Sequence, residues 1–159
     1  MNILFLCTGN SCRSIIAEAL FKSMAPAGMA VQSAGSKPAG FVHPRALAVL
    51  RAAGIAVEGL SSKSWDNLPE KPDAVITLCD EAAGESCPLY FGKVVRSHWG
   101  IPDPAKVTGG EEAINTAFAS TLDVLRKRVG ALTRLTFEEL ERNGQALQKA
   151  LDAIVKQYA

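Results

Sequence analysis

The stretch that decides the fold reads Cys7-Thr8-Gly9-Asn10-Ser11-Cys12-Arg13-Ser14, and it joins two segments of different hydrophobic periodicity. The apolar residues 3–6 before it predict a short buried strand, whereas residues 14–20 carry apolar side chains at helical spacing. The loop therefore leads from the end of a strand directly into the N-terminus of a helix.

This loop has the residue types of an oxyanion site with a nucleophile at its floor. Unpaired N–H groups at a helix N-terminus let residues 8–13 wrap a tetrahedral oxyanion, and the guanidinium of Arg13 matches two oxygens at once. The same positive surroundings are expected to lower the pKa of Cys7 and to populate its thiolate. Gly9 permits a tight curl, and Asn10 tolerates the left-handed conformation that such loops need. The candidate oxyanion-binding residues are Thr8, Gly9, Asn10, Ser11, Cys12, Arg13 and Ser14, the last of which can also donate its hydroxyl to the thiolate.

Composition limits the remaining function classes. At 159 residues with 48% hydrophobic content, the chain has the size of one compact domain with a full core. Its 17 Lys and Arg nearly balance 16 Asp and Glu, so no overall field attracts nucleic acid or an anionic membrane. No segment resembles a membrane span or a signal peptide, and we expect a cytoplasmic protein.

Strand and helix patterns alternate along the chain. Strands are expected near 2–7, 30–34, 73–78 and 93–97, and helices near 14–25 and 44–53, the second beginning at His43-Pro44. This alternation predicts one α/β domain over residues 1–159, with a four-stranded parallel sheet flanked by helices on both faces.

Two further helices are expected after residue 110. The first starts near Glu111. A possible capping box of Thr136 and Glu139 starts the last one, a C-terminal helical extension of about 136–159. We expect this extension to pack on the domain rather than on a partner, with Leu140, Leu147, Leu151 and Ile154 facing inward.

Cysteine placement points to redox chemistry or burial rather than to disulfide scaffolding. Cys79 follows the apolar run 73–78, so it should lie at the carboxyl end of a strand, as Cys7 does, where the two can come close. In a reducing compartment, cysteines are more often buried, metal-binding or redox-active than structurally bridged. Zinc sites usually pair cysteines about two to four residues apart. Neither Cys7 and Cys12 nor Cys79 and Cys87 fit that spacing, and we expect no metal and no cofactor.

Several segments together resemble the arsenate reductases of the low-molecular-weight protein tyrosine phosphatase fold. They are residues 7–14, Ser33-Ala34-Gly35, Thr77-Leu78-Cys79-Asp80, Cys87-Pro88, and His98-Trp99-Gly100 through Asp103-Pro104, in order over roughly residues 1–130. The phosphatases share only the first loop and the Asp-Pro pair. They carry an aromatic residue where this chain has Ala105, and they lack counterparts of Cys79 and Cys87. A phosphatase of this fold is the alternative function.

The resemblance implies a three-thiol relay that reduces arsenate to arsenite. Cys7 attacks the oxyanion while Asp103 acts as general acid, Cys79 then attacks Cys7, and Cys87 attacks Cys79 to leave a disulfide for an external reductant. The implied reductant is thioredoxin, with glutaredoxin and glutathione as the alternative. Two buried structural cysteines, or a redox-sensing or oxyanion-binding module without turnover, remain open. The implied catalytic residues are Cys7, Cys79, Cys87, Arg13 and Asp103.

A second set of residues is implied to support the loop. Some family members bind potassium through counterparts of Asn10, Glu18 and Ser33 and of an aspartate, in whose position this chain has Lys63. The lysine ammonium can occupy the cation's place and bond the same oxygens, or it is a solvated loop lysine. We also expect His43 and His98 to satisfy backbone groups near the site and Cys12 to be structural, although it can form a disulfide with Cys7 on oxidation.

Overall fold

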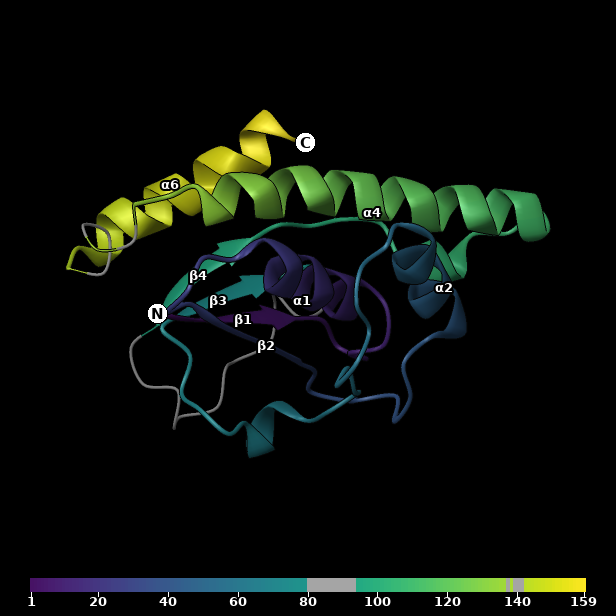
Figure 1. The fold of residues 1–159 in the computed structure, drawn as a ribbon, viewed down its shortest axis with the longest axis horizontal. Helices are drawn as coiled ribbons and strands as arrows, with labels where there is room; N and C mark the ends of the chain where they lie inside the picture. The colour runs from purple at the N-terminus through teal and green to yellow at the C-terminus, as the bar shows by residue number, and fades with distance from the viewer. Residues whose placement is uncertain (80–93, 137, 139–141) are drawn as a thin grey trace.

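The computed structural model describes residues 1–79, 94–136, 138 and 142–159, and it shows one parallel sheet with helices packed on it (Figure 1). The strand order is β2-β1-β3-β4, and every neighbouring pair is parallel. The strands are β1 (Asn2–Leu6), β2 (Ala30–Ala34), β3 (Ala74–Thr77) and β4 (Val95–His98). Within the described ranges, the α-helices are α1 (Arg13–Met24), α2 (Pro44–Ala52), α4 (Glu111–Thr133) and α6 (Gly144–Gln157), and the 3-10 turns are η1 (Trp65–Asn67) and η3 (Pro104–Lys106). The expected four-stranded parallel α/β sheet is confirmed.

Strand alternation divides the buried side chains between the two faces of the sheet. Ile3 and Phe5 of β1 join the main core, to which α1, α2, α4 and α6 all contribute. Leu4 and Leu6 point to the opposite face and pack with Trp65 of η1. Helical segments therefore cover both faces, but all the α-helices that the structure describes lie on one of them (Figure 1).

The first residues of α2 confirm the prediction that His43 satisfies a backbone group. Pro44 occupies the first helical position, and the side chain of His43 accepts a hydrogen bond from Arg45 N at 3.1 Å. A nitrogen acceptor here satisfies one of the N–H groups that a helix start leaves without a partner.

The last helix begins later than the sequence suggests. α6 starts at Gly144, where Asn143 Oδ1 accepts from the N–H groups of Gln145 and Ala146. α6 itself therefore does not start near Thr136, because Asn143 provides its cap, whereas the predicted capping box of Thr136 and Glu139 lies partly outside the described residues and stays a prediction. Its inward residues are as expected: Leu147, Leu151 and Ile154 are buried in the main core, and α6 packs on β4 and α4. Glu139 and Leu140 lie outside the described residues. No helix in the described part of the chain is long and apolar enough to cross a membrane.

The carbonyl groups of the loop at residues 7–14 are held by the segment at residues 35–43. Lys37 N donates to Thr8 O at 3.0 Å, Ala39 N to Gly9 O at 2.8 Å, and His43 N to Ser11 O at 2.9 Å. Because its carbonyl oxygens bond to this segment, the loop can turn N–H groups toward the other side, where α1 begins.

Gly35 is required for this close approach. A Cβ atom at this position would lie 2.3 Å from Thr8 O and 2.5 Å from Cys7 O, both backbone atoms that cannot rotate away. Gly35 N also donates to Lys63 O, and its own carbonyl accepts from Trp65 N, each at 3.0 Å. Gly35 thus packs against the loop and is hydrogen-bonded to the segment at residues 63–65.

We predict that Gly35→Ala displaces the loop at residues 7–14. The overpacked variant should lose about 1–3 kcal/mol of unfolding free energy in urea titrations and bind inorganic phosphate more weakly by calorimetry. Gly130→Ala is the control, because its Cβ would meet nothing closer than 3.7 Å within α4. There the substitution should add about 1 kcal/mol of stability. Wild-type phosphate affinity and stability in Gly35→Ala would contradict the assignment.

Candidate active site

The loop at residues 7–14 presents the start of α1 without a side-chain cap. Cys12 is the N-cap residue of α1 and makes no capping hydrogen bond, and the first turn contains no acidic residue. Asn10 has φ of 44°, the left-handed conformation expected for it. An uncapped N-terminus next to a buried cysteine, Cys7, leaves N–H groups and the positive end of the helix dipole for an anion.

Arg13 links this loop to the segment that carries the candidate acid. Its Nη1 donates to Ile101 O at 3.0 Å, and its Nη2 lies 3.5 Å from Asp103 Oδ2. Its Nε is buried and has no hydrogen-bond partner among the described residues. A buried donor without a partner is costly, so this N–H is available for an oxyanion oxygen.

These residues face one cavity of about 710 Å³. Its lining consists of Thr8, Gly9, Arg13, Cys79, Gly100, Ile101, Pro102, Asp103 and Lys106. The structure therefore brings together the predicted Arg13, Asp103 and Cys79. Lys106 is exposed at the end of η3 and is an addition that sequence reasoning missed. In the sequence, the only indication of this position is that Lys106 is a basic residue three positions after the candidate acid, Asp103. The described lining contains no aromatic ring.

Cys79 lies directly against the nucleophile loop, as the strand order predicts. Leu78 N donates to Leu6 O at 2.9 Å, so the chain leaves β1 and β3 side by side. Cys79 Sγ is 3.5 Å from both the N and Oγ1 of Thr8, and the thiols of Cys7 and Cys79 share a hydrogen bond. Cys7, Cys12 and Cys79 are buried and in no disulfide. Cys87 lies outside the described residues.

The expected lowering of the Cys7 pKa is wrong for this arrangement of thiols. The hydrogen bond with Cys79 is the largest influence and, with burial, raises the pKa of Cys7 well above its usual value. The charge of Arg13 and the N–H of Gly9 lower it, but they do not outweigh the contact with the second thiol.

Cys12 has a different environment within the same loop. Burial raises the pKa of Cys12 to about 11, and the nearby charge of Asp103 acts in the same direction. The thiol of Cys12 is therefore protonated near neutral pH, which agrees with a structural role.

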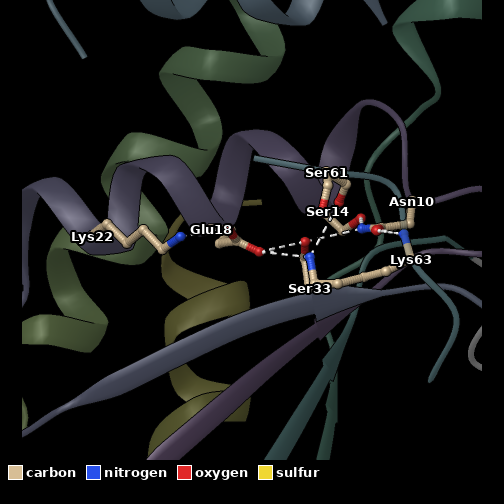
Figure 2. Close-up of polar contacts among 7 residues, drawn as sticks. All are labelled: Asn10, Ser14, Glu18, Lys22, Ser33, Ser61 and Lys63. Atoms are coloured by element: carbon tan, nitrogen blue, oxygen red, sulfur yellow. Dashed lines mark hydrogen bonds and ion pairs between the residues drawn. The ribbon is translucent and has the colours of Figure 1, made fainter. Parts of the chain in front are cut away.

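Behind the loop, Asn10, Ser14, Glu18, Ser33 and Lys63 form what we term the loop-support cluster (Figure 2). Asn10 Nδ2 donates to Ser14 Oγ at 2.8 Å and to Ser33 Oγ at 3.0 Å, while Asn10 Oδ1 accepts from Lys63 N at 2.8 Å. Ser33 Oγ donates to Glu18 Oε1 at 2.7 Å. Ser14 Oγ is thus a member of this cluster, and its donation to Cys7 stays a prediction.

The buried carboxylate of Glu18 pairs with two lysines in and beside the loop-support cluster. Glu18 is 2% exposed, and its Oε1 lies 3.4 Å from Lys63 Nζ, which also donates to Ser61 O at 3.1 Å. Its Oε2 pairs with Lys22 Nζ at 2.8 Å (Figure 2). The ammonium of Lys63 therefore lies between oxygen atoms of Glu18 and Ser61. Among the described residues, no group of three or more His, Cys, Asp or Glu side chains is arranged to bind a metal ion.

Arsenate reductases are among the known proteins that this chain resembles both in sequence and in structure. The chain is 41% identical over 128 residues to an arsenate reductase of Bacillus licheniformis, covering 80% of this chain and 91% of that protein. A solved structure of an arsenate reductase in the phosphate-binding state superposes with a TM-score of 0.69 at 28% identity, covering 83% of this chain and 95% of that one.

A thioredoxin-dependent arsenate reductase from Corynebacterium glutamicum has a TM-score of 0.56 at 28% identity, covering 92% of this chain and 63% of that one. The family described as low molecular weight phosphotyrosine protein phosphatase matches residues 2–146. The chain therefore belongs to this phosphatase family, and within it the chain is similar to arsenate reductases.

Proposed function

We propose that this protein reduces arsenate to arsenite by a thiol/disulfide relay through Cys7, Cys79 and Cys87. The observation that carries the proposal is the buried thiol of Cys79, hydrogen-bonded to Cys7 beside a cavity lined by Arg13 and Asp103. Hydrolysis of a phosphate ester needs no second thiol. Reduction of As(V) does, because water cannot supply two electrons.

In the first step, the N–H groups of the loop and the free N–H of Arg13 hold arsenate above Cys7. The thiolate of Cys7 attacks arsenic, an S–As bond forms and one As–O bond breaks. Asp103, on the cavity wall beside Arg13, supplies a proton to the departing oxygen, which leaves as water.

In the second step, Cys79 attacks Sγ of Cys7. The electron pair of the S–As bond stays with arsenic, which is thereby reduced to As(III) and leaves as arsenite, and a Cys7–Cys79 disulfide forms. The short distance from Cys79 to the loop supports this step, because Cys79 Sγ contacts Thr8 next to the nucleophile.

In the third step, Cys87 attacks Cys79, restores the thiolate of Cys7 and leaves a Cys79–Cys87 disulfide. Thioredoxin then reduces that disulfide. The name of the Corynebacterium glutamicum relative supports thioredoxin over glutaredoxin with glutathione. A relay of unbridged thiols needs a reducing compartment, which supports a cytoplasmic location.

The phosphatase alternative accounts for fewer of the observed residues. It uses Cys7, Arg13 and Asp103 but assigns no task to Cys79. The described lining of the cavity also contains no aromatic side chain against which an aryl phosphate can stack. Both features favour a small inorganic oxyanion as the substrate.

We predict arsenate-dependent oxidation of NADPH when the protein is supplied with thioredoxin and thioredoxin reductase. Cys7→Ser should abolish all chemistry. Cys79→Ser and Cys87→Ser should block arsenate reduction while leaving hydrolysis of an aryl phosphate, because only the relay is lost. A glutaredoxin and glutathione assay identifies the other donor. Aryl phosphate hydrolysis without arsenate reduction in either system would establish the phosphatase instead.

We further predict that Cys79→Ala shifts the alkylation of Cys7 to lower pH. The hydrogen bond with Cys79 is the largest influence that raises the pKa of Cys7. Its removal should therefore let the Cys7 thiolate, stabilised by the charge of Arg13, form at lower pH. Peptide mass spectrometry after iodoacetamide labelling, as a function of pH, measures the midpoint. The Cys12 midpoint, expected near pH 11, serves as the internal control. An unchanged or higher Cys7 midpoint would refute this reading of the thiol pair.

We also propose that Lys63 replaces a potassium ion in the loop-support cluster, with its ammonium beside Glu18 and Ser61 O. Turnover should then be independent of potassium. Lys63→Met should lower the free energy of unfolding by about 1–2 kcal/mol, since a charged hydrogen bond to a buried carboxylate is lost. Lys22→Met removes the other, half-exposed partner of Glu18 and should cost less. Strong activation of the wild type by potassium chloride over sodium chloride would contradict the proposal.

A further inference from the structure

Two arginines from different helices, Arg13 of α1 and Arg128 of α4, bind the residues that lead to Asp103. We term residues 99–103, between β4 and η3, the acid loop. The carbonyls of Trp99 and Gly100 accept hydrogen bonds from Arg128 Nη1 at 2.8 and 3.4 Å. The next carbonyl, of Ile101, accepts from Arg13 Nη1 at 3.0 Å. The carbonyls of three consecutive residues of the acid loop are thereby held by two arginines.

Arg128 is an unusual residue to find inside α4. It is 3% exposed, and burial lowers the pKa of its guanidinium. Among the described residues it pairs with no carboxylate, and its hydrogen bonds there all go to backbone carbonyls, including Tyr158 O from Nε at 3.0 Å. An apolar side chain fills such a position at lower cost, since a buried cation has to recover its lost hydration. A buried guanidinium at this position therefore indicates that Arg128 serves to hold the carbonyl groups that it binds.

The C-terminal helix supports the acid loop as well. Tyr158, whose carbonyl binds Arg128, is the C-cap residue of α6. Trp99 Nε1 donates to Leu151 O at 3.1 Å, and in β4, just before the acid loop, Ser97 Oγ donates to Asp152 Oδ1 at 2.7 Å. These contacts come from residues beyond 146, where the match to the phosphatase family ends.

We propose that Arg128 is a positioning residue for the general acid, and that α6 shares this task through Tyr158. Arg128 fixes the peptides of Trp99 and Gly100, so that Ile101 O and the carboxylate of Asp103 both face Arg13. The planar guanidinium reaches carbonyls on the acid loop and on α6 at the same time, which a lysine ammonium on a flexible stem does not reproduce. The inference rests on the proposed function only in that Asp103 donates the proton.

Arg128→Lys tests the proposal, with Arg126→Lys as the matched control because Arg126 is an exposed residue of the same helix. In Arg128→Lys, the amides of Trp99, Gly100, Ile101 and Asp103 should exchange with deuterium about tenfold faster, while those of β1 stay unchanged. The kcat for arsenate reduction should fall about ten- to a hundredfold at similar KM, since only the acid is misplaced. Unchanged exchange in the acid loop, or a raised KM with unchanged kcat, overturns the proposal.

An Asp103→Asn background separates positioning of the acid from a general structural effect. If Arg128 acts through Asp103, adding Arg128→Lys to Asp103→Asn lowers kcat little further. If the same fold loss appears in both backgrounds, the proposal is overturned. Deuterium exchange does not require turnover, so failure of the proposed function shows as a wild type without arsenate-dependent activity, independently of the exchange result.

A shorter chain tests the part assigned to α6. Deletion of residues 158–159 removes the Tyr158 carbonyl, whereas Tyr158→Ala keeps it. The deletion should speed exchange in the acid loop and lower kcat, each by less than Arg128→Lys does. Tyr158→Ala should have the exchange rate and the kcat of the wild type. The deletion leaves Arg128 in place, so it remains informative if Arg128→Lys does not fold. A deletion variant identical to the wild type overturns the role of α6.

Discussion

An anion-binding loop can direct its N–H groups at one point only if its carbonyl oxygens have partners elsewhere. In this protein the segment at residues 35–43 provides those partners, with N–H groups that bind the carbonyls of Thr8, Gly9 and Ser11. The approach is so close that only glycine fits at residue 35. The loop-support cluster then fixes Asn10 from behind. The conformation of the candidate oxyanion loop thus depends on segments outside the loop itself.

The contact between Cys7 and Cys79 combines two requirements that oppose each other. A nucleophile needs a low pKa, but a relay needs a second thiol within reach, and the hydrogen bond between the two raises the pKa of Cys7. The charge of Arg13 and the N–H of Gly9 act in the opposite direction. In a phosphatase of the same fold, the first requirement stands alone. The position of Cys79 therefore favours electron transfer over simple hydrolysis.

Arg13 links the candidate oxyanion loop to the loop that carries Asp103. It starts α1 and faces the cavity, and the same guanidinium contacts Ile101 O and Asp103 on the acid loop. Arg128 holds the preceding peptides from the side of α4 and α6. The loop that carries Asp103, the candidate acid, is consequently bonded to residues from widely separated parts of the chain, and the C-terminal helix belongs to the same network of hydrogen bonds.

The sequence alone determined features that depend on local backbone preferences. The strands and first helices, the left-handed Asn10 and the cap at His43 follow from periodicity and from the conformations that single residues favour. The order of elements also predicted that Cys7 and Cys79 meet at one edge of the sheet, and Cys79 lines the same cavity there as Asp103.

Tertiary structure decided whatever depends on distances between remote segments. Thr136 and Asn143 are both acceptable helix caps, and α6 begins at the second. The sign of the Cys7 pKa shift needed the distance to Cys79, and the site role of Lys106 needed the cavity. Arg128 reads in sequence as one more cation beside Arg126 and Lys127, and only the packing of α4 makes it a buried donor to the acid loop. Electrostatic and hydrogen-bonding effects act through space, and their sign is set by neighbours that the order of residues does not reveal.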